Sequence, residues 1–285
     1  MAKKNKNRRF YDYSLLFTII FIMAFGLVMI YSASSYMAQL KYGDAAYFMM
    51  RQLKIGVAGL VIALVISKMD YHWYARFALF AYALSYVLMI AVSLFGKVVN
   101  GKRRWLQLGP ISFQPTEFVK IALIVLLATV ITQMGKKINS WKAMAVVMGL
   151  AIPIAGIVAA NNLSSGIIIV GIAFVMLFVA CKKSWPFYLC GIGAVSTIFL
   201  AGPLASFLEA TQILKPYQLE RIHVWLEPEA YKLDGGFQVL QGLYAIGSGG
   251  LLGVGLGQSR QKYLYLPEPQ NDFIFAIVCE ELGLV

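Results

Sequence analysis

The stretch that decides the fold is residues 143–180, AMAVVMGLAIPIAGIVAANNLSSGIIIVGIAFVMLFVA. It contains two apolar runs, 143–160 and 166–180, with no charged residue in either and one polar interruption between them. About 20 apolar residues let a helix cross a bilayer, and roughly 17 to 25 are usual. Each run approaches or reaches that length, so the stretch predicts two consecutive membrane-spanning helices joined by a short polar turn.

The same pattern recurs along the chain. Of the 285 residues, 60% are hydrophobic and 13% are charged, and the mean hydropathy is +0.71, whereas about a quarter of the residues in soluble domains are charged. In lipid the backbone must satisfy its own hydrogen bonds, and the runs do not alternate as barrel strands do, so the spans must be helices. We predict an all-α polytopic membrane protein with seven complete transmembrane helices and the start of an eighth at Phe273. The seven runs lie near residues 14–34, 52–67, 75–95, 118–133, 143–160, 166–180 and 187–207.

The basic residues predict the orientation. The net charge of +12 is spread over loops that flank the spans, which argues against a nucleic-acid partner. With a cytoplasmic N-terminus, the inside segments carry as many Lys and Arg residues as the outside segments but have only about a third of their length. The higher density of positive charge inside agrees with the positive-inside rule. The first run exceeds the roughly 7 to 15 residues of a cleaved signal, so we expect it to stay as an anchor. The three cysteines lie in or beside spans and imply no disulfide framework.

This topology predicts a single membrane domain, 1–285, with a cytoplasmic tail at 1–13 and a large extracytoplasmic loop at 208–272 between the seventh and eighth helices. A loop of that length is usually functional, which indicates work at the outer face. Residues 218–226 have helical spacing and fit either the headgroup region or the helix bundle. Nine glycines between Gly235 and Gly257 predict tight re-entrant turns or close backbone approach.

The segment Gln114–Lys120, QPTEFVK, opens the fourth run. Pro115 suits the first turn of a helix, and Glu117 lies where the helix dipole favours an anion. Lys120 follows three residues later on the same face, and a lysine at this depth is costly without a partner or a wet cavity. Two interpretations stay open: a Glu117–Lys120 pair that fixes the helix end, or a lysine that binds an anionic group such as a diphosphate.

Further basic candidates lie in the two longer outer segments. Arg103 and Arg104, after Lys102 and before Trp105, would attract lipid headgroups or form a solvated basic turn. Arg260 and Lys262 supply positive charge shortly before the closing apolar run.

Asp272 stands outside the membrane at the predicted first turn of the eighth helix. A carboxylate there is either an N-cap or a general base that takes a proton from a nearby hydroxyl. Glu280 and Glu281 lie about two turns further in and are predicted to hydrogen-bond neighbouring helices rather than to catalyse. Between the fifth and sixth runs, residues 161–166 predict a polar turn with capping serines.

Several segments together resemble a known family: NGKRRWLQLGPISFQPTEFVK at 100–120, GGFQVLQGLYAIGSGGLLGVGLGQSRQKYLYLPEP at 235–269 and NDFIFAIVCEELG at 271–283. The chain resembles the SEDS family (shape, elongation, division and sporulation) of peptidoglycan glycosyltransferases, and is more similar to the FtsW-like division and sporulation branch than to the RodA-like elongation branch. The resemblance implies ten transmembrane helices with both termini inside, so we expect this sequence to be truncated at its C-terminal end.

The resemblance also implies the activity, which is polymerisation of lipid II into glycan strands with inversion and release of undecaprenyl diphosphate. The family's essential aspartate, in its D-F-I-F motif, corresponds to Asp272. Its Gln-Pro-Ser-Glu-x-x-Lys motif corresponds to residues 114–117 and Lys120. Two departures stand out: Gln270-Asn271 replaces a common His-Thr, and Asn162 replaces the aspartate of a common Pro-Asp-Leu-Gly-Thr. Implied partners are a lipid-linked glycan, a class B penicillin-binding protein and other divisome proteins at the septum of the plasma membrane.

The resulting hypothesis makes Asp272 the catalytic base for the acceptor sugar. Cations held near the membrane surface would stabilise the charge that grows on the departing diphosphate; the candidates are Lys120, Arg103, Arg104, Arg260 and Lys262. A divalent cation, magnesium or manganese, could share that task, although no ligand cluster with diagnostic spacing is visible and His72 and His223 lie on opposite sides of the predicted membrane. The alternatives are a flippase or transporter of the lipid-linked precursor, because charged residues within spans also suit a transport path, and a non-catalytic division scaffold.

Overall fold

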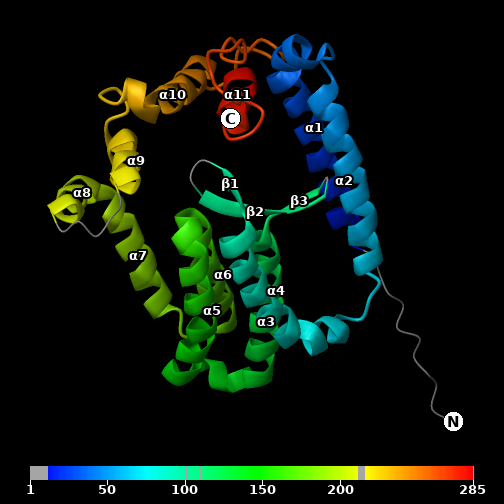
Figure 1. Ribbon diagram of the computed structural model, residues 1–285, viewed down its shortest axis with the longest axis vertical. Coiled ribbons are helices and arrows are strands. Elements are labelled where there is room, and N and C mark those ends of the chain that lie inside the picture. Colours follow the sequence, from blue (N-terminus) through cyan, green and yellow to red (C-terminus); the bar gives the residue numbers. More distant parts are fainter. Residues whose placement is uncertain (1–11, 100–101, 110, 211–215, 285) are drawn as a thin grey trace. The chain divides into compact units, whose positions relative to one another are not determined.

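The computed structural model describes residues 12–99, 102–109, 111–210 and 216–284. The chain divides into two compact units (Figure 1). The first unit joins residues 1–67 to 199–285, and the second comprises residues 68–198. The single membrane domain expected from the sequence stays a prediction, and each unit is described separately below.

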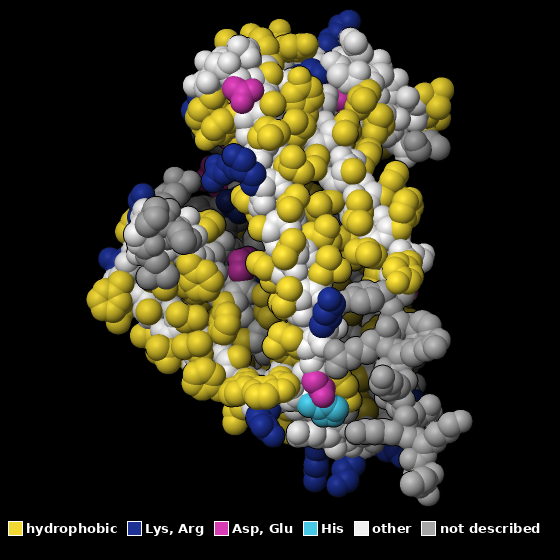
Figure 2. All heavy atoms as spheres, turned by 90° about the vertical axis from the view of Figure 1, so that its right-hand side faces the viewer, with side chains coloured by type: hydrophobic (Ala, Val, Ile, Leu, Met, Phe, Trp, Pro, Cys, Tyr) yellow, Lys and Arg dark blue, Asp and Glu magenta, His cyan; other side chains and the backbone are white. Residues whose placement is uncertain are grey.

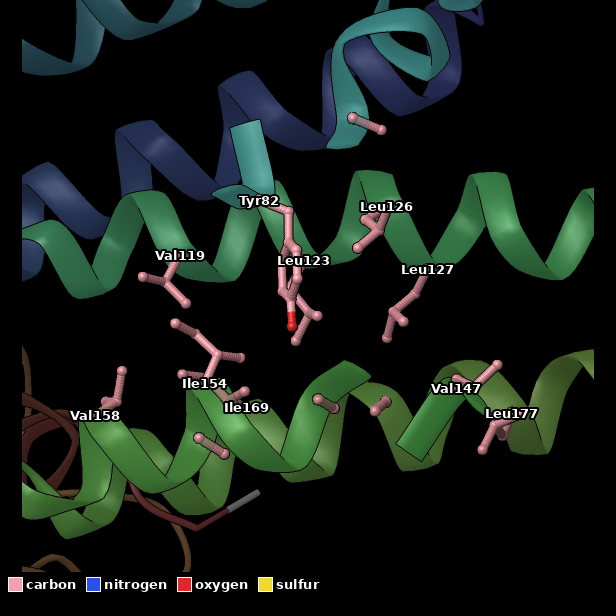
Figure 3. Close-up of a cluster of buried hydrophobic side chains, with 14 of the residues drawn as sticks. Tyr82, Val119, Leu123, Leu126, Leu127, Val147, Ile154, Val158, Ile169 and Leu177 are labelled. Atoms are coloured by element: carbon pink, nitrogen blue, oxygen red, sulfur yellow. The ribbon is translucent and has the colours of Figure 1, made fainter. Parts of the chain in front are cut away.

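The second unit is a helical bundle with a small sheet. Its elements in order are α3 (Tyr71–Phe95), β1 (Lys97–Val99), β2 (Lys102–Leu108), β3 (Ile111–Phe113), α4 (Pro115–Met134), η1 (Gly135–Asn139), α5 (Trp141–Asn161), α6 (Leu163–Ala180) and α7 (Trp185–Phe199). Apolar side chains of α3 to α6 form its core (Figure 3), where Leu123, Ile154 and Ile169 are fully buried. The hydroxyl group of Tyr82 has a hydrogen-bond partner within this core, since it donates to the carbonyl oxygen of Leu150 at 2.6 Å.

The segment between α3 and α4 forms a sheet, where the sequence predicted only a loop. β2 pairs antiparallel with β1 and with β3, giving the strand order β1-β2-β3. A β-bulge interrupts the register between Lys97 and Val98. The sheet places the basic part of β2 beside the ends of the helices.

The first unit contains two long helices and several short ones. Its elements are α1 (Tyr13–Tyr42), α2 (Tyr47–Ile66), α8 (Ala201–Ala210), α9 (Pro216–Leu226), the π-helical turn η2 (Lys232–Gly236), α10 (Phe237–Gly249) and α11 (Ile274–Leu282). α9 confirms the helix predicted near 218–226. α10 packs against α11 at a distance that only glycine permits, because a Cβ on Gly249 would lie 2.1 Å from the carbonyl oxygen of Cys279. The glycines therefore allow close backbone approach, as expected.

Six helices among the described residues are long and apolar enough to cross a membrane: Tyr13–Tyr42, Tyr47–Ile66, Tyr71–Phe95, Pro115–Asn139, Trp141–Asn161 and Leu163–Ala180. Hydrophobic side chains cover most of the face that Figure 2 shows, as a lipid-facing surface requires. The chain is thus a helical polytopic membrane protein. The run at 187–207, expected as one span, divides at Leu200 into α7 and α8. Pro203, in the first turn of α8, accounts for the break, because it has no N–H to donate to the carbonyl oxygen of Phe199 and its ring would clash with that carbonyl in a continuous helix.

Candidate active site

Asp272 lies just before α11 with its side chain exposed. The N-cap of α11 is Phe273, and no side chain caps this helix. Among the described residues, no hydrogen bond or ion pair engages the Asp272 carboxylate. The carboxylate is therefore not an N-cap, and it is open to an incoming hydroxyl group.

The turn before Asp272 is held by its own side chains. Glu268 adopts a left-handed backbone conformation with φ of 48°. Its Oε2 accepts hydrogen bonds from the side-chain amides of Gln270 at 3.0 Å and Asn271 at 2.8 Å. Gln270 and Asn271 depart from the family pattern. Their side chains stabilise the turn that precedes Asp272 by donating hydrogen bonds to Glu268.

α10 supports the same turn from one side. Gln238 donates its side-chain amide to the carbonyl oxygen of Pro267 at 3.2 Å. One helical turn further along, Gly242 leaves room for the ring of Phe273, since a Cβ there would approach the ring to 2.8 Å. These two contacts come from one face of α10, so the backbone on both sides of Asp272 is held by a regular helix.

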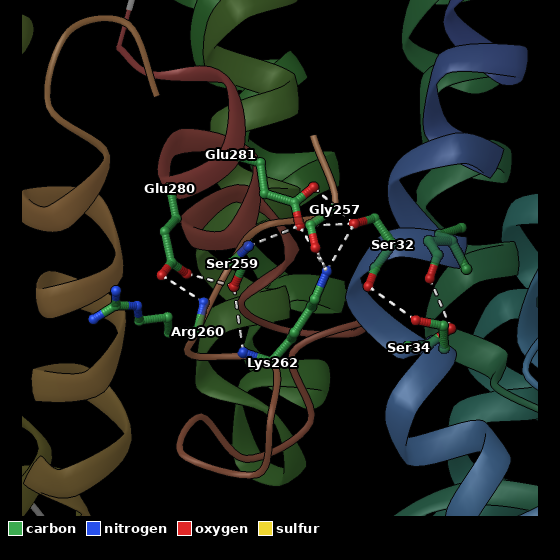
Figure 4. Close-up of polar contacts among 10 residues, drawn as sticks. Ser32, Ser34, Gly257, Ser259, Arg260, Lys262, Glu280 and Glu281 are labelled. Carbon is green, nitrogen blue, oxygen red and sulfur yellow. Dashed lines mark hydrogen bonds and ion pairs between the residues drawn. The ribbon is translucent and has the colours of Figure 1, made fainter. Parts of the chain in front are cut away.

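A buried polar cluster joins α11 to α1 and to residues 257–262 (Figure 4). Glu280 and Glu281 of α11 are 2% and 1% exposed. Glu280 accepts from the hydroxyl of Ser259 and from the backbone N–H of Arg260. Glu281 accepts from Ser32 of α1 at 2.7 Å and from the backbone N–H of Ser259 at 3.3 Å. The predicted hydrogen bond to a neighbouring helix is confirmed for Glu281, through Ser32 of α1, whereas the partners of Glu280 lie in the segment between α10 and α11.

Lys262 belongs to this cluster rather than to the surface. Its side chain is almost fully buried, and its Nζ lies 3.1 Å from Glu281, 2.6 Å from the carbonyl oxygen of Gly257 and 3.4 Å from Ser32. Three partners match the three donors of an ammonium group. This geometry gives Lys262 a structural role, so diphosphate binding by Lys262 stays a prediction that its burial does not favour.

Arg260 is placed differently. Its backbone is fixed by Glu280, whereas its side chain is exposed and lines a cavity of about 590 Å³. Ser248, Val254, Gln258, Gln261 and Glu280 also line this cavity. The carbonyl oxygen of the Gln261 side chain is buried without a partner among the described residues. The cavity therefore offers the Arg260 cation to a polar ligand.

Lys120 and Glu117 form the predicted pair in the second unit. Their Nζ and Oε2 atoms lie 2.7 Å apart, and Pro115 is the first residue of α4. The lysine side chain is 24% exposed and that of the glutamate 56%. A cation that retains this much exposure can still contact an anion, so neither interpretation is excluded and the binding role stays a prediction.

Arg103 and Arg104 have partners that the sequence did not reveal. Arg103 donates to the carbonyl oxygens of Ser93 and Leu94 at the end of α3, and Arg104 donates to that of Asn161, the last residue of α5, at 3.3 Å. The last carbonyls of a helix lack partners within the helix and attract positive charge. Both arginines therefore supply hydrogen-bond donors to carbonyl groups at helix C-termini, and neither is part of a merely solvated turn.

The turn between α5 and α6 is capped by asparagine rather than by serine. The Oδ1 atom of Asn162 accepts from the backbone N–H of Ser165 at 3.4 Å and serves as the N-cap of α6. Gly166 permits the close return, because a Cβ there would lie 2.6 Å from that of Ala159. Serines were expected from the sequence to cap this helix, and that expectation is wrong, because Asn162 is the N-cap of α6.

No group of three or more His, Cys, Asp or Glu side chains suited to a metal ion occurs among the described residues. A divalent cation at this site stays a prediction.

Comparison with known proteins places these features in context. Residues 13–285 match the model of the FtsW/RodA/SpoVE family, described as "Cell cycle protein". Stage V sporulation protein E of Bacillus subtilis is 38% identical over 279 residues, which cover 96% of this chain and 73% of that protein. The probable peptidoglycan glycosyltransferase FtsW of Trichlorobacter lovleyi is 35% identical over 279 residues, covering 96% of this chain and 71% of that protein.

Solved structures agree in fold. A chain of a peptidoglycan synthase complex that coordinates polymerization and crosslinking matches 96% of this chain and 71% of its own length, with 27% identity and a TM-score of 0.69. The rod shape determining protein RodA of Thermus thermophilus matches 83% of this chain and 85% of its own length, with 23% identity and a TM-score of 0.52. At that identity the likeness to RodA concerns the fold alone.

Proposed function

Because the chain belongs to the FtsW/RodA/SpoVE family of cell cycle proteins, we propose that it is a peptidoglycan glycosyltransferase of the bacterial plasma membrane. Relatives of 33 to 35% identity bear that name. The observation that carries the proposal in this chain is the exposed Asp272 carboxylate, which has no internal partner among the described residues while both sides of its backbone are held. An acid placed in this way is organised for a reaction rather than for stability.

The proposed substrate is lipid II, the disaccharide-pentapeptide linked to undecaprenyl diphosphate. Asp272 takes the proton from the 4-hydroxyl of the acceptor sugar, and the oxygen attacks the anomeric carbon of the donor. The bond between that carbon and the diphosphate oxygen breaks on the opposite face. The anomeric carbon is inverted, and undecaprenyl diphosphate leaves with the bonding electrons.

The departing diphosphate needs positive charge beside it. Among the candidates of the first unit, Arg260 fits best, because its guanidinium is exposed at a polar cavity while Lys262 is paired inside. Glu280, which holds the Arg260 backbone, lies about two helical turns along α11 from Asp272. Lys120, Arg103 and Arg104 of the second unit are retained as further candidates, and magnesium or manganese could share the task.

An apolar groove in the second unit suits a polyprenyl chain. It has a volume of about 570 Å³ and is lined by α5, α6 and α7, including small residues such as Gly156, Gly171 and Gly191. We propose that part of a lipid tail lies there, because the groove offers almost no polar surface.

The finer topology is also a proposal. α7 and α8 together form the seventh crossing, α11 begins the eighth, the N-terminus is cytoplasmic, and the segment from 208 to 272 faces outward. A class B penicillin-binding protein and other divisome proteins at the septum are the proposed partners. The first of these is supported by the likeness to a synthase complex that couples polymerization to crosslinking.

The activity is tested with the purified full-length protein, its partner transpeptidase and labelled lipid II. We expect glycan strands and free undecaprenyl diphosphate, both of which should require this protein. Movement of labelled lipid II across vesicles containing the protein, without polymer, would instead identify a flippase. If the protein neither polymerises nor moves lipid II, a scaffold function is indicated and the proposal fails.

A further inference from the structure

Two interhelical connections of the second unit are joined by hydrogen bonds at one end of its helical bundle. η1 joins α4 to α5, and residues 181–184 join α6 to α7. The Oδ1 atom of Asn139 accepts from the backbone N–H of Lys182 at 2.7 Å, and the thiol of Cys181 donates to the carbonyl oxygen of Ile138 at 3.6 Å. Ile138 and Cys181 are both buried. The two connections therefore form one surface with a fixed arrangement.

This surface carries five lysines, all of them exposed: Lys136, Lys137, Lys142, Lys182 and Lys183. Among the described residues, no carboxylate forms an ion pair with any of the five. The sequence has no Asp or Glu from residue 118 to residue 208. The second unit contains only two acidic residues: Glu117 pairs with Lys120 at the other end of α4, and Asp70 caps α3 and contacts His72 at 2.7 Å.

Two tryptophans border the lysines. Trp141 begins α5 and Trp185 begins α7, and their rings meet edge to face with centroids 6.1 Å apart. Both side chains are more than half exposed. A tryptophan with one apolar and one polar edge prefers the headgroup level of a bilayer. The lysines of this end therefore lie where lipid phosphates are concentrated.

We propose that these five lysines, with Trp141 and Trp185, form a binding site for the headgroups of anionic phospholipids. In the proposed topology the site faces the cytoplasmic leaflet. The positive-inside rule accounts for basic residues in such loops but not for two loops tied into a single surface. A lipid is favoured over an acidic protein segment because the tryptophan pair places the surface at the bilayer boundary. The chemistry recognised is a phosphodiester with a net negative charge.

The site is tested by titrating the full-length protein in neutral detergent with phosphatidylglycerol and with phosphatidylcholine, counting bound lipids by native mass spectrometry. Each lysine near an anionic lipid surface contributes about fivefold to binding. We therefore expect phosphatidylglycerol to bind preferentially, and Lys137→Gln/Lys183→Gln to weaken that binding by about tenfold or more. Lys137→Arg/Lys183→Arg should retain it, which separates charge from folding.

The matched control is Lys97→Gln/Lys232→Gln, which removes two exposed lysines elsewhere in the chain. It should leave phosphatidylglycerol binding within twofold, and millimolar glycerol phosphate should not compete. Equal weakening by the control would mean that only the net charge matters, and equal affinity for both lipids would overturn the proposal. Competition by glycerol phosphate or by a soluble polyglutamate peptide, with no preference between lipids, would identify a different anion and would also overturn it.

Discussion

Replacing Lys262 with methionine should destabilise the first unit by about 3 to 5 kcal/mol, because the substitution leaves the carboxylate of Glu281 buried without its cation. Glu281 is 1% exposed, so water cannot replace the lost charge in the folded state. The hydroxyl of Ser32 and the backbone N–H of Ser259 remain as donors, but neither carries a positive charge. The assay is reversible unfolding of the full-length protein in mixed micelles with increasing dodecyl sulfate, followed by helicity.

A double substitution isolates the pair. Lys262→Met/Glu281→Gln removes both charges and should recover about 1 to 3 kcal/mol relative to the sum of the single changes. Lys232→Met, at an exposed lysine of the same unit, should stay within about 0.5 kcal/mol of the parent protein. If Lys262→Met costs no more than Lys232→Met, the ammonium is not paired in the folded protein and the argument for its structural role is refuted.

Two further predictions concern packing and thiol reactivity. Gly249→Ala should cost about 1 to 3 kcal/mol in the same unfolding assay, because its Cβ would meet the Cys279 carbonyl oxygen and force α10 away from α11; a cost below that of Gly247→Ala, where space is open, would contradict the packing. Burial raises the pKa of the Cys181 thiol, so less of it is thiolate at neutral pH. Maleimide should therefore label Cys181, in a chain whose other cysteines are replaced, only as the pH rises above the usual thiol range; rapid labelling at pH 7 would refute its burial.

Much of the helical architecture was predictable because lipid imposes a simple rule on sequence. Apolar runs such as 143–160 correspond to α5 within a few residues, and Pro115 marks the start of α4 as its fixed backbone angle requires. The hydrogen-bonded burial of Glu280 and Glu281 was also predictable, since a buried carboxylate needs donors whatever the fold, although only Glu281 finds its donor on a neighbouring helix.

Other features depended on contacts between distant residues. The sheet of β1 to β3 was missed because the membrane pattern masks short strands in a basic loop. Arg103 and Arg104 were identified as cations, but their helix-end partners were not. The partners of Arg103 lie just before it at the end of α3, which was a local signal, whereas Asn161, the partner of Arg104, lies far away in sequence. Lys262 was predicted as a candidate cation for the diphosphate, because nothing local shows that Ser32 and Glu281 enclose its side chain.

The most direct test of the account replaces Asp272 with asparagine, a change that keeps the shape of the side chain and removes its capacity as a base. The full-length variant is incubated with its partner and lipid II, and glycan strands are followed over time beside Glu229→Gln, an exposed acid of the same segment. We predict that Asp272→Asn abolishes polymer while its unfolding profile is unchanged, and that Glu229→Gln polymerises at the parent rate. Strands of normal length and rate from Asp272→Asn would show that another group takes the proton.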